Sequence, residues 1–228
     1  MKPIYMVGGS KGGVGKSCVS AALIDALLAR SESILLVDAD TSNPDVYKMH
    51  KNEVKTELIN LDDANGWIDL VNVCDANPDA TVVINTAARN NKGVAAYGKM
   101  LSDEETLKAL QRRLVTLWVI NRQRDSLELL KEYAEALPES AIHVIRNCYY
   151  GEEKQFELYN DSKLRTTIEG NDGLSLNFPD LADRVSDALY SKRLSIAAGM
   201  KALPIGHRAE LTRWRAEAHK MFEALLDG

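Results

Sequence analysis

A chain of 228 residues, of which 45% are hydrophobic and 27% charged, has the size and balance of one globular α/β domain. Its formal net charge of −5 excludes a surface that is basic overall, so direct DNA contact would need a local basic patch. Three widely spaced cysteines without a C-x-x-C pair exclude a disulfide framework and a thiolate metal site, and no apolar run is long enough for a membrane span. Because the first apolar run begins at Ile4, we expect no signal peptide and a location in the cytoplasm.

Short apolar runs alternate with longer helical patterns, which predicts parallel βαβ units. We expect strands at 4–7, 34–37, 81–84, 114–120, 142–145 and, more weakly, 174–177. We expect helices at 17–30, 63–74, 104–113, 126–137, 181–190 and 208–226, the third with a capping box formed by Ser102 and Glu105. Continuous apolar strands indicate a mostly parallel sheet with helices on both faces, in one domain over residues 1–228. In such a sheet ligands bind beyond the carboxyl ends of the strands.

A glycine-rich loop follows the first strand and leads directly into a helix. Residues 8–17 read G-G-S-K-G-G-V-G-K-S. Glycines lack the Cβ atoms that would keep backbone N–H groups from closing around an anionic oxygen, and the helix N-terminus favours the same anion. In this setting Lys16 would reach the β- and γ-phosphates of a nucleotide, and the Ser17 hydroxyl would bind Mg²⁺. The alternative is a glycine-rich loop with solvated lysines.

The loop departs from the ordinary P-loop pattern G-x-x-x-x-G-K-[ST], because Ser10 replaces the first glycine and Lys11 follows it. The segment K-G-G-V-G-K-S resembles the deviant Walker A motif of the ParA/MinD family of P-loop ATPases. The resemblance implies a P-loop NTPase domain that binds ATP or ADP with Mg²⁺ and forms a nucleotide-sandwich dimer. In that dimer Lys16 would contact the nucleotide of its own chain, and Lys11 that of the partner chain. The resemblance also implies nucleotide contacts by Gly12, Gly13, Val14, Gly15, Ser17 and Cys18.

Acidic side chains follow the second strand. Asp38 and Asp40 are two residues apart at its carboxyl end, so both can face a Mg²⁺–phosphate group. The segment resembles the family's D-x-D-P switch I, although Pro44 comes later than the family's proline. The resemblance implies a role in hydrolysis for Asp40 and a place in the metal sphere for Asp38, with Asp45 as a weaker third candidate. The alternative is that these acids only cap a strand–loop junction.

The third expected strand is followed by Asn85, where P-loop NTPases place an aspartate that accepts hydrogen bonds from Mg²⁺-bound water. An amide oxygen can accept such a bond but brings no negative charge. We therefore expect a weak Mg²⁺-dependent ATPase, with a non-hydrolysing, ATP-bound regulatory protein as the alternative. A metabolic P-loop kinase, ligase or synthetase is a third hypothesis, for which the sequence marks no acceptor-substrate pocket.

Polar loops also follow the fourth and fifth strands. Arg122 and Arg124 could face phosphates across a dimer or simply be solvated. Asn147 resembles the asparagine of the family's N-[KR] segment, which implies contact with adenine; the alternative is an ordinary turn asparagine.

The C-terminal pattern at 207–226 predicts an amphipathic helix whose apolar side consists of Leu211, Trp214, Ala218, Phe222 and Leu225. We favour a helix packed on the sheet, with its basic side in solvent. The alternatives are non-specific DNA binding by that side, helped by Lys192 and Arg193, and attachment to a membrane surface. Several glutamates dilute its positive charge, so we rank the membrane lowest.

The segment K-G-G-V-G-K-S, the altered switch II at Asn85 and the sequence S-N-P-D at 42–45 together resemble the StbB-like accessory ATPases of plasmid stability and conjugation. This resemblance implies a molecular switch in plasmid DNA positioning, segregation or conjugative transfer. It implies a homodimer in the ATP state and an adaptor or DNA-binding partner protein. DNA contact would be indirect or through a local basic patch. The location implied is the bacterial cytoplasm, on the nucleoid if DNA is bound.

Overall fold

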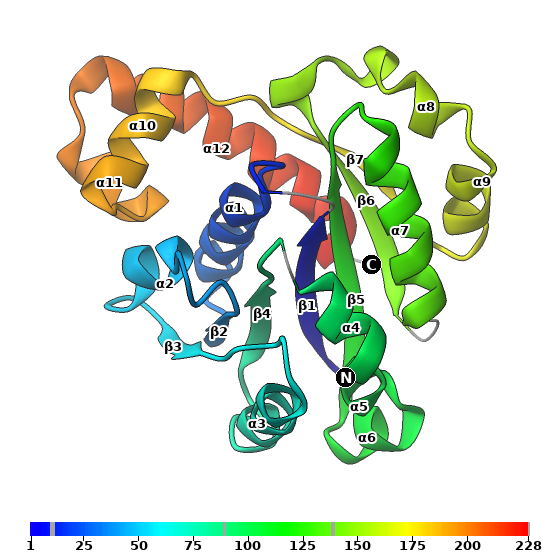
Figure 1. Ribbon diagram of the computed structural model, residues 1–228. Helices are drawn as coiled ribbons and strands as arrows, with labels where there is room; N and C mark the ends of the chain where they lie inside the picture. Colours follow the sequence, from blue (N-terminus) through cyan, green and yellow to red (C-terminus); the bar gives the residue numbers. More distant parts are fainter. Residues whose placement is uncertain (10–11, 89, 138–139, 228) are drawn as a thin grey trace.

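Seven parallel strands form one sheet in the computed structural model, which describes residues 1–9, 12–88, 90–137 and 140–227 (Figure 1). The strands are β1 (Lys2–Gly9), β2 (Ile34–Asp38), β3 (Lys55–Leu58), β4 (Thr81–Asn85), β5 (Arg112–Ile120), β6 (Ala141–Asn147) and β7 (Ser175–Phe178). Their order across the sheet is β3-β2-β4-β1-β5-β6-β7. The predicted α/β fold with a parallel sheet is therefore confirmed.

Helices cover both faces of this sheet (Figure 1). The α-helices are α1 (Lys16–Ala29), α2 (Asp45–His50), α3 (Ala64–Asp75), α4 (Asn91–Tyr97), α5 (Lys99–Ser102), α6 (Glu104–Ala109), α7 (Arg124–Ala136), α8 (Glu157–Asn160), α9 (Lys163–Gly170), α10 (Asp183–Lys192), α11 (Ile196–Ala202) and α12 (Ile205–Leu226). Two 3₁₀ turns, η1 (Cys148–Tyr150) and η2 (Glu153–Gln155), lie between β6 and α8.

The central strand β1 shows why its sequence is a continuous apolar run. Tyr5 and Val7 pack into a core formed with α1, α2, α10, α11 and α12. Ile4 and Met6 point the other way, into a second core formed with α3 to α9. Side chains alternate between the two faces of a strand, so a strand covered on both faces needs apolar residues at every position.

The edge strand β3 was missed because it lacks an apolar run. Its sequence is K-T-E-L, and Leu58 is 44% exposed. It joins the sheet through its backbone, in register with β2 from the pair Leu35 and Lys55 to the pair Asp38 and Leu58. An edge strand with one side open to solvent places few demands on its side chains, so the pattern carries little signal.

The third expected helix was wrong in both its cap and its end. The N-cap of α6 is Asp103, whose carboxylate accepts a hydrogen bond from the Thr106 backbone N–H at 3.1 Å, and Ser102 instead ends α5. The helix stops at Ala109, and Gln111 takes a left-handed φ of 53°. Arg112 opens β5 with a buried guanidinium that donates to the carbonyl oxygen of Ala80 at 2.8 Å.

The C-terminal helix packs against α1, side by side with it in Figure 1, as we favoured from the sequence. Its five predicted apolar residues are all buried. Asp25 of α1 is buried as well, and its Oδ2 accepts from Arg215 Nε and His219 Nε2, each at 2.6 Å. Part of the basic side of α12 therefore serves to hold it on α1. None of the helices in the described part of the chain is long and apolar enough to cross a membrane.

Candidate functional site

The carboxyl ends of β1, β2, β4 and β6 bring the predicted site residues to one edge of the sheet (Figure 1). The register aligns Val7 of β1 with Asn85 of β4, and Asn85 with Asp38 of β2. The loop after β1 leads into α1 at the same edge. Lys11, together with Ser10, lies outside the described residues.

Two geometric needs, a left-handed φ and close packing, account for glycines of the loop. Gly13 and Gly15 have left-handed φ angles of 78° and 106°, which side chains with a Cβ rarely adopt. A Cβ at Gly15 would also lie 2.4 Å from the Nδ2 atom of Asn147, and one at Gly9 would lie 2.8 Å from Cγ1 of Val14. No atom of the described residues lies within 4 Å of the Cβ position of Gly12. The loop is therefore packed against the protein on one side and open on the other, which is what an anion cradle requires.

Lys16, the first residue of α1, is only 7% exposed. Burial lowers the pKa of Lys16 to about 8, while the nearby Asp40 carboxylate acts in the opposite direction. A lysine buried at the N-terminus of a helix, where the helix dipole is positive, is placed to bind an anion. Ser17 follows it in the first turn, partly exposed. Burial raises the pKa of the Cys18 thiol to about 12, so this thiol stays protonated and neutral.

Asp38 and Asn85 form a buried pair at the ends of β2 and β4. Asn85 Nδ2 donates to Asp38 Oδ1 at 2.9 Å, and Ser20 Oγ donates to Asn85 Oδ1 at 3.0 Å. A carboxylate can only accept, so the amide nitrogen must face Asp38 and the amide oxygen must face Ser20. The oxygen expected to accept from metal-bound water thus already accepts one hydrogen bond, from Ser20.

Asp38 also organises the segment predicted as switch I. Its Oδ1 accepts from the backbone N–H of Asp40 at 3.2 Å, and its Oδ2 accepts from that of Tyr47 at 3.0 Å. Burial raises the pKa of the Asp38 carboxyl, and these hydrogen bonds oppose the rise. Asp45 lies in the first turn of α2, where its carboxylate accepts from Asn43 Nδ2 at 2.8 Å. The structure thus places Asp38 and Asp40 at the loop edge and engages Asp45 in the start of a helix.

Asn147 and Tyr150 contact the backbone of the glycine loop directly. Asn147 Nδ2 donates to the carbonyl oxygen of Val14 at 2.9 Å, and its Oδ1 accepts from the backbone N–H of Tyr149 at 3.1 Å. The Tyr150 hydroxyl donates to the carbonyl oxygen of Gly13 at 2.7 Å. Contact of Asn147 with adenine stays a prediction.

Sequence reasoning missed two residues of this site, Ser20 and Tyr150. Ser20 lies one helical turn after Ser17 in α1, a spacing that could have marked a second hydroxyl near the loop. No sequence signal separated Tyr150 from its neighbour Tyr149, because the contact with Gly13 joins residues far apart in the chain.

Two hollows differ in their relation to this edge. A cavity of about 390 Å³ beside the loop is lined by Asn121, Arg122, Gln123, Tyr150 and Gln155. A larger hollow of about 890 Å³ lies between α7, α9 and the start of β6, at the opposite edge of the sheet. The smaller hollow lies beside the predicted site, and Arg122 is one of its lining residues. Arg124 is exposed at the start of α7.

No group of three His, Cys, Asp or Glu side chains converges on a metal position within the described ranges. Mg²⁺ in phosphate sites is held by a few protein oxygens together with phosphates and water, so it needs no preformed cage. Hydroxyl and carboxylate oxygens are the right donors for this ion. Ser17 and Asp38 fit that role, which remains a prediction.

The buried Asn85–Asp38 pair predicts that the variant Asn85→Asp loses stability, and that this loss depends on pH. Two buried carboxylates would then face each other, and one would keep a proton that the unfolded chain releases. The free energy of unfolding of the variant should fall by roughly 2 kcal/mol relative to wild type at about pH 8, and by less near pH 5. Urea unfolding at both pH values measures this.

The double variant Asp38→Asn/Asn85→Asp restores one carboxylate and one amide in exchanged positions. It should recover part of the stability lost at high pH. Equal stability of wild type and Asn85→Asp at high pH would show that the pair is not buried as described.

Comparison with known proteins agrees with this geometry. Residues 5–150 match the CobQ/CobB/MinD/ParA nucleotide binding domain. The chain is 64% identical to Protein MobD of Acidithiobacillus ferrooxidans over 225 residues, which cover 99% of this chain and 98% of the relative.

Solved structures of low sequence identity share the fold. The MinD cell division protein of Aquifex aeolicus superposes with a TM-score of 0.55 at 14% identity, over 93% of this chain and 96% of that chain. The MinC:MinD cell division protein complex of the same organism gives 0.61 at 12% identity, over 100% and 97%. The cell division ATPase MinD of Pyrococcus furiosus gives 0.52 at 17% identity, over 96% and 99%. With its domain match, its parallel sheet and its glycine loop before a buried lysine, the chain belongs to the ParA/MinD family of nucleotide-binding proteins.

Proposed function

We propose that this protein is an ATP-binding molecular switch that hydrolyses ATP slowly and forms a nucleotide-sandwich dimer. The observation that carries the proposal is the buried Lys16 ammonium at the N-terminus of α1, behind a glycine loop that is open on its outer side. Family membership supports nucleotide binding in general. Plasmid DNA positioning, segregation or conjugative transfer is the role implied by the resemblance to plasmid accessory ATPases, and the close relation to Protein MobD supports it.

Each site residue has a proposed role that suits its chemistry. The loop amides and Lys16 would bind the phosphates, and Asn147 would contact adenine. When bound, Mg²⁺ would neutralise phosphate charge; Ser17 and Asp38 would hold it. Asp40, whose carboxylate acts on Lys16 electrostatically, would orient the attacking water. Lys11 would reach the nucleotide of the partner chain.

We expect slow turnover because Asn85 brings no negative charge to the end of β4. Its amide nitrogen donates to Asp38 and its oxygen accepts from Ser20, so both are engaged in the fold. The same observation keeps the alternative of a non-hydrolysing, ATP-bound regulatory protein. Phosphate release over time separates the two, because only a hydrolase gives a continuing rate. A metabolic enzyme would also need a second pocket for an acceptor substrate, and phosphoryl transfer to a small molecule in a screen would favour that hypothesis.

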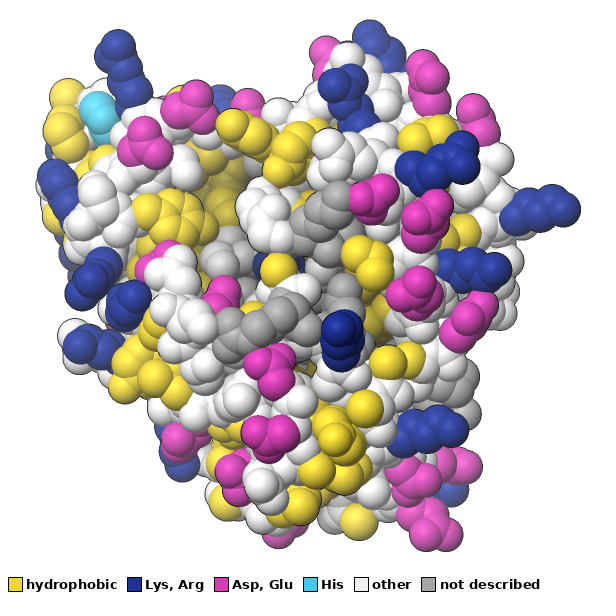
Figure 2. All heavy atoms as spheres, in the orientation of Figure 1, with side chains coloured by type: hydrophobic (Ala, Val, Ile, Leu, Met, Phe, Trp, Pro, Cys, Tyr) yellow, Lys and Arg dark blue, Asp and Glu magenta, His cyan; other side chains and the backbone are white. Residues whose placement is uncertain are grey.

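For DNA contact, we propose the surface around Lys192, Arg193 and Lys201, where α10 ends and α11 follows. We call this surface the corner, and we propose it in place of the middle of α12. Arg213 of α12 is paired with Glu210 and Glu217, at 2.6 and 2.9 Å. Residues 188–209, in contrast, contain no Asp or Glu, and Lys192, Arg193 and Lys201 are exposed. Within the described chain, none of these three has a carboxylate at ion-pair distance. Dark blue side chains line the left margin of Figure 2, over α2 and α11.

The dimer proposal predicts a change of solution mass. Light scattering should give a monomer with ADP–Mg²⁺ and twice that mass with ATP–Mg²⁺. Lys16→Ala should lose nucleotide binding, whereas Lys11→Ala should bind ATP and stay monomeric. Dimers of Lys11→Ala in ATP would refute the role of Lys11, and a mass indifferent to nucleotide would refute the sandwich dimer.

The lowered pKa of Lys16 predicts that nucleotide affinity falls with rising pH. Above about pH 8 the free protein loses the positive charge that attracts phosphate. The dissociation constant of ADP–Mg²⁺ should therefore rise about tenfold from about pH 7 to about pH 9, as measured by calorimetric titration. Lys16→Arg should bind more weakly but with a flatter profile, because the guanidinium stays charged. A flat wild-type profile would contradict the prediction.

The corner proposal predicts a salt-dependent loss of DNA binding. Replacing Lys192, Arg193 and Lys201 by Ala should weaken binding to mixed-sequence duplex in ATP and reduce the slope of log affinity against log salt by about 2–3. Fluorescence anisotropy at several salt concentrations measures this. Arg213→Ala is the matched control, because its charge is already paired. An equal loss in the control would argue against the corner.

A further inference from the structure

We infer that Tyr150 is a positioning residue that holds the glycine loop in its phosphate-binding shape, which no sequence motif indicated. The inference rests on the proposed function, since it requires that the loop binds phosphate. Its hydroxyl donates to the carbonyl oxygen of Gly13 at 2.7 Å, across 137 positions of the chain.

Two consecutive carbonyl groups of the loop are held from the same segment of the chain. Tyr150 binds the carbonyl of Gly13, and Asn147 binds that of Val14 at 2.9 Å. A peptide unit is planar and trans, so its N–H points opposite to its C=O. Holding these two carbonyls aims the N–H groups of Val14 and Gly15 away from Tyr150 and Asn147, toward the other side of the loop.

The loop needs such an external restraint because glycine restrains itself poorly. Gly13 has a φ of 78°, in a region that glycine enters and leaves at little cost. Among the described residues, no atom lies within 4 Å of the Cβ position of Gly13, so none of their side chains fixes it by packing. A hydrogen bond to its carbonyl therefore selects one conformation among several that the free loop could adopt.

Tyr150 can act as an anchor because its own segment is fastened to the sheet. It ends η1, and the start of this turn is held by Asn147 Oδ1, which accepts from the Tyr149 N–H at 3.1 Å. The rings of Tyr149 and Tyr150 contact edge to face, with centroids 5.2 Å apart. The turn that carries the hydroxyl is thus restrained by both backbone and ring contacts.

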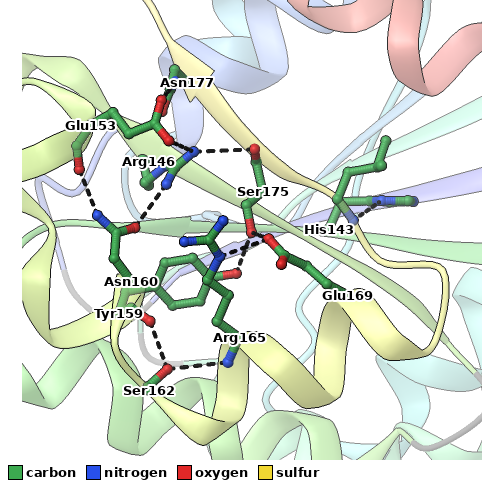
Figure 3. A network of polar contacts seen from close by, with 11 residues as sticks. His143, Arg146, Glu153, Tyr159, Asn160, Ser162, Arg165, Glu169, Ser175 and Asn177 are labelled. Carbon is green, nitrogen blue, oxygen red and sulfur yellow. Dashed lines mark hydrogen bonds and ion pairs between the residues drawn. The ribbon is translucent and has the colours of Figure 1, made fainter.

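Figure 3 shows the polar network that fastens the segment between β6 and β7. Arg146 of β6, with its side chain 3% exposed, donates to Asn160 Oδ1 at 2.8 Å and pairs with Glu153 at 3.2 Å. Glu153 in turn accepts from Asn177 of β7 at 2.7 Å. The segment that contains η1 is therefore tied to both neighbouring strands.

The test compares two adjacent tyrosines. Tyr150→Phe keeps the ring and removes only the hydroxyl, which is partly exposed, so the fold should persist. Tyr149→Phe is the matched control, because this side chain is 61% exposed and its hydroxyl makes no hydrogen bond among the described residues. Calorimetric titrations with ADP–Mg²⁺, GDP–Mg²⁺ and inorganic pyrophosphate would be made on wild type and both variants, with urea unfolding to verify their stability.

We expect Tyr150→Phe to weaken the binding of all ligands that wild type binds by a common factor of about 3–10, the loss of one hydrogen bond. Tyr149→Phe should match wild type. A common factor locates the effect at the phosphates, which pyrophosphate shares with the nucleotides.

Three results would overturn the inference. Unchanged binding by Tyr150→Phe would remove the positioning role and leave nucleotide binding intact. A loss for nucleotides but not for pyrophosphate would assign the hydroxyl to the base or ribose. If wild type bound none of the three ligands, the proposed function itself would fail, together with this inference.

Discussion

The register of the parallel strands is the constraint on which the site depends. Val7, Asp38 and Asn85 lie at the same level of three adjacent strands because β4 pairs with both β1 and β2. A shift of one residue would turn each of these strands over and exchange its two apolar faces. Both faces are buried, so the cores that fix the register also bring Asp38 beside Asn85 and place the glycine loop next to them.

At the carboxyl ends of β2 and β4, the amide of Asn85 hydrogen-bonds to Asp38 where an aspartate would bring a second negative charge. A buried carboxylate is stable only when its acceptors are satisfied, and Asp38 receives donors from Asn85, Asp40 and Tyr47. Asn85 thus supports Asp38 and the following loop, where an aspartate would repel it in the absence of a cation. This arrangement agrees with the slow turnover that we propose for this protein.

Packing between helices decides which of their basic side chains are paired with acidic ones. Along α12, basic residues recur at positions that suggest an open basic face, but Arg213 is paired with Glu210 and Glu217, and Arg215 and His219 meet the buried Asp25. Lys192, Arg193 and Lys201, where α10 ends and α11 follows, are exposed and have no carboxylate at ion-pair distance among the described residues. An amphipathic pattern in one helix does not show which charges a neighbouring helix will neutralise.

The sequence by itself determined the α/β fold, six of the seven strands, the glycine loop and the apolar side of α12, because these depend on local spacing and burial pattern. The tertiary structure alone decided β3, whose edge position asks little of its side chains, and the end of α6, where Arg112 is drawn into β5. It also decided the partners of Asn85 and the contact between Tyr150 and Gly13. Such contacts join residues 47 to 137 positions apart, and only the packed sheet brings them within hydrogen-bond distance.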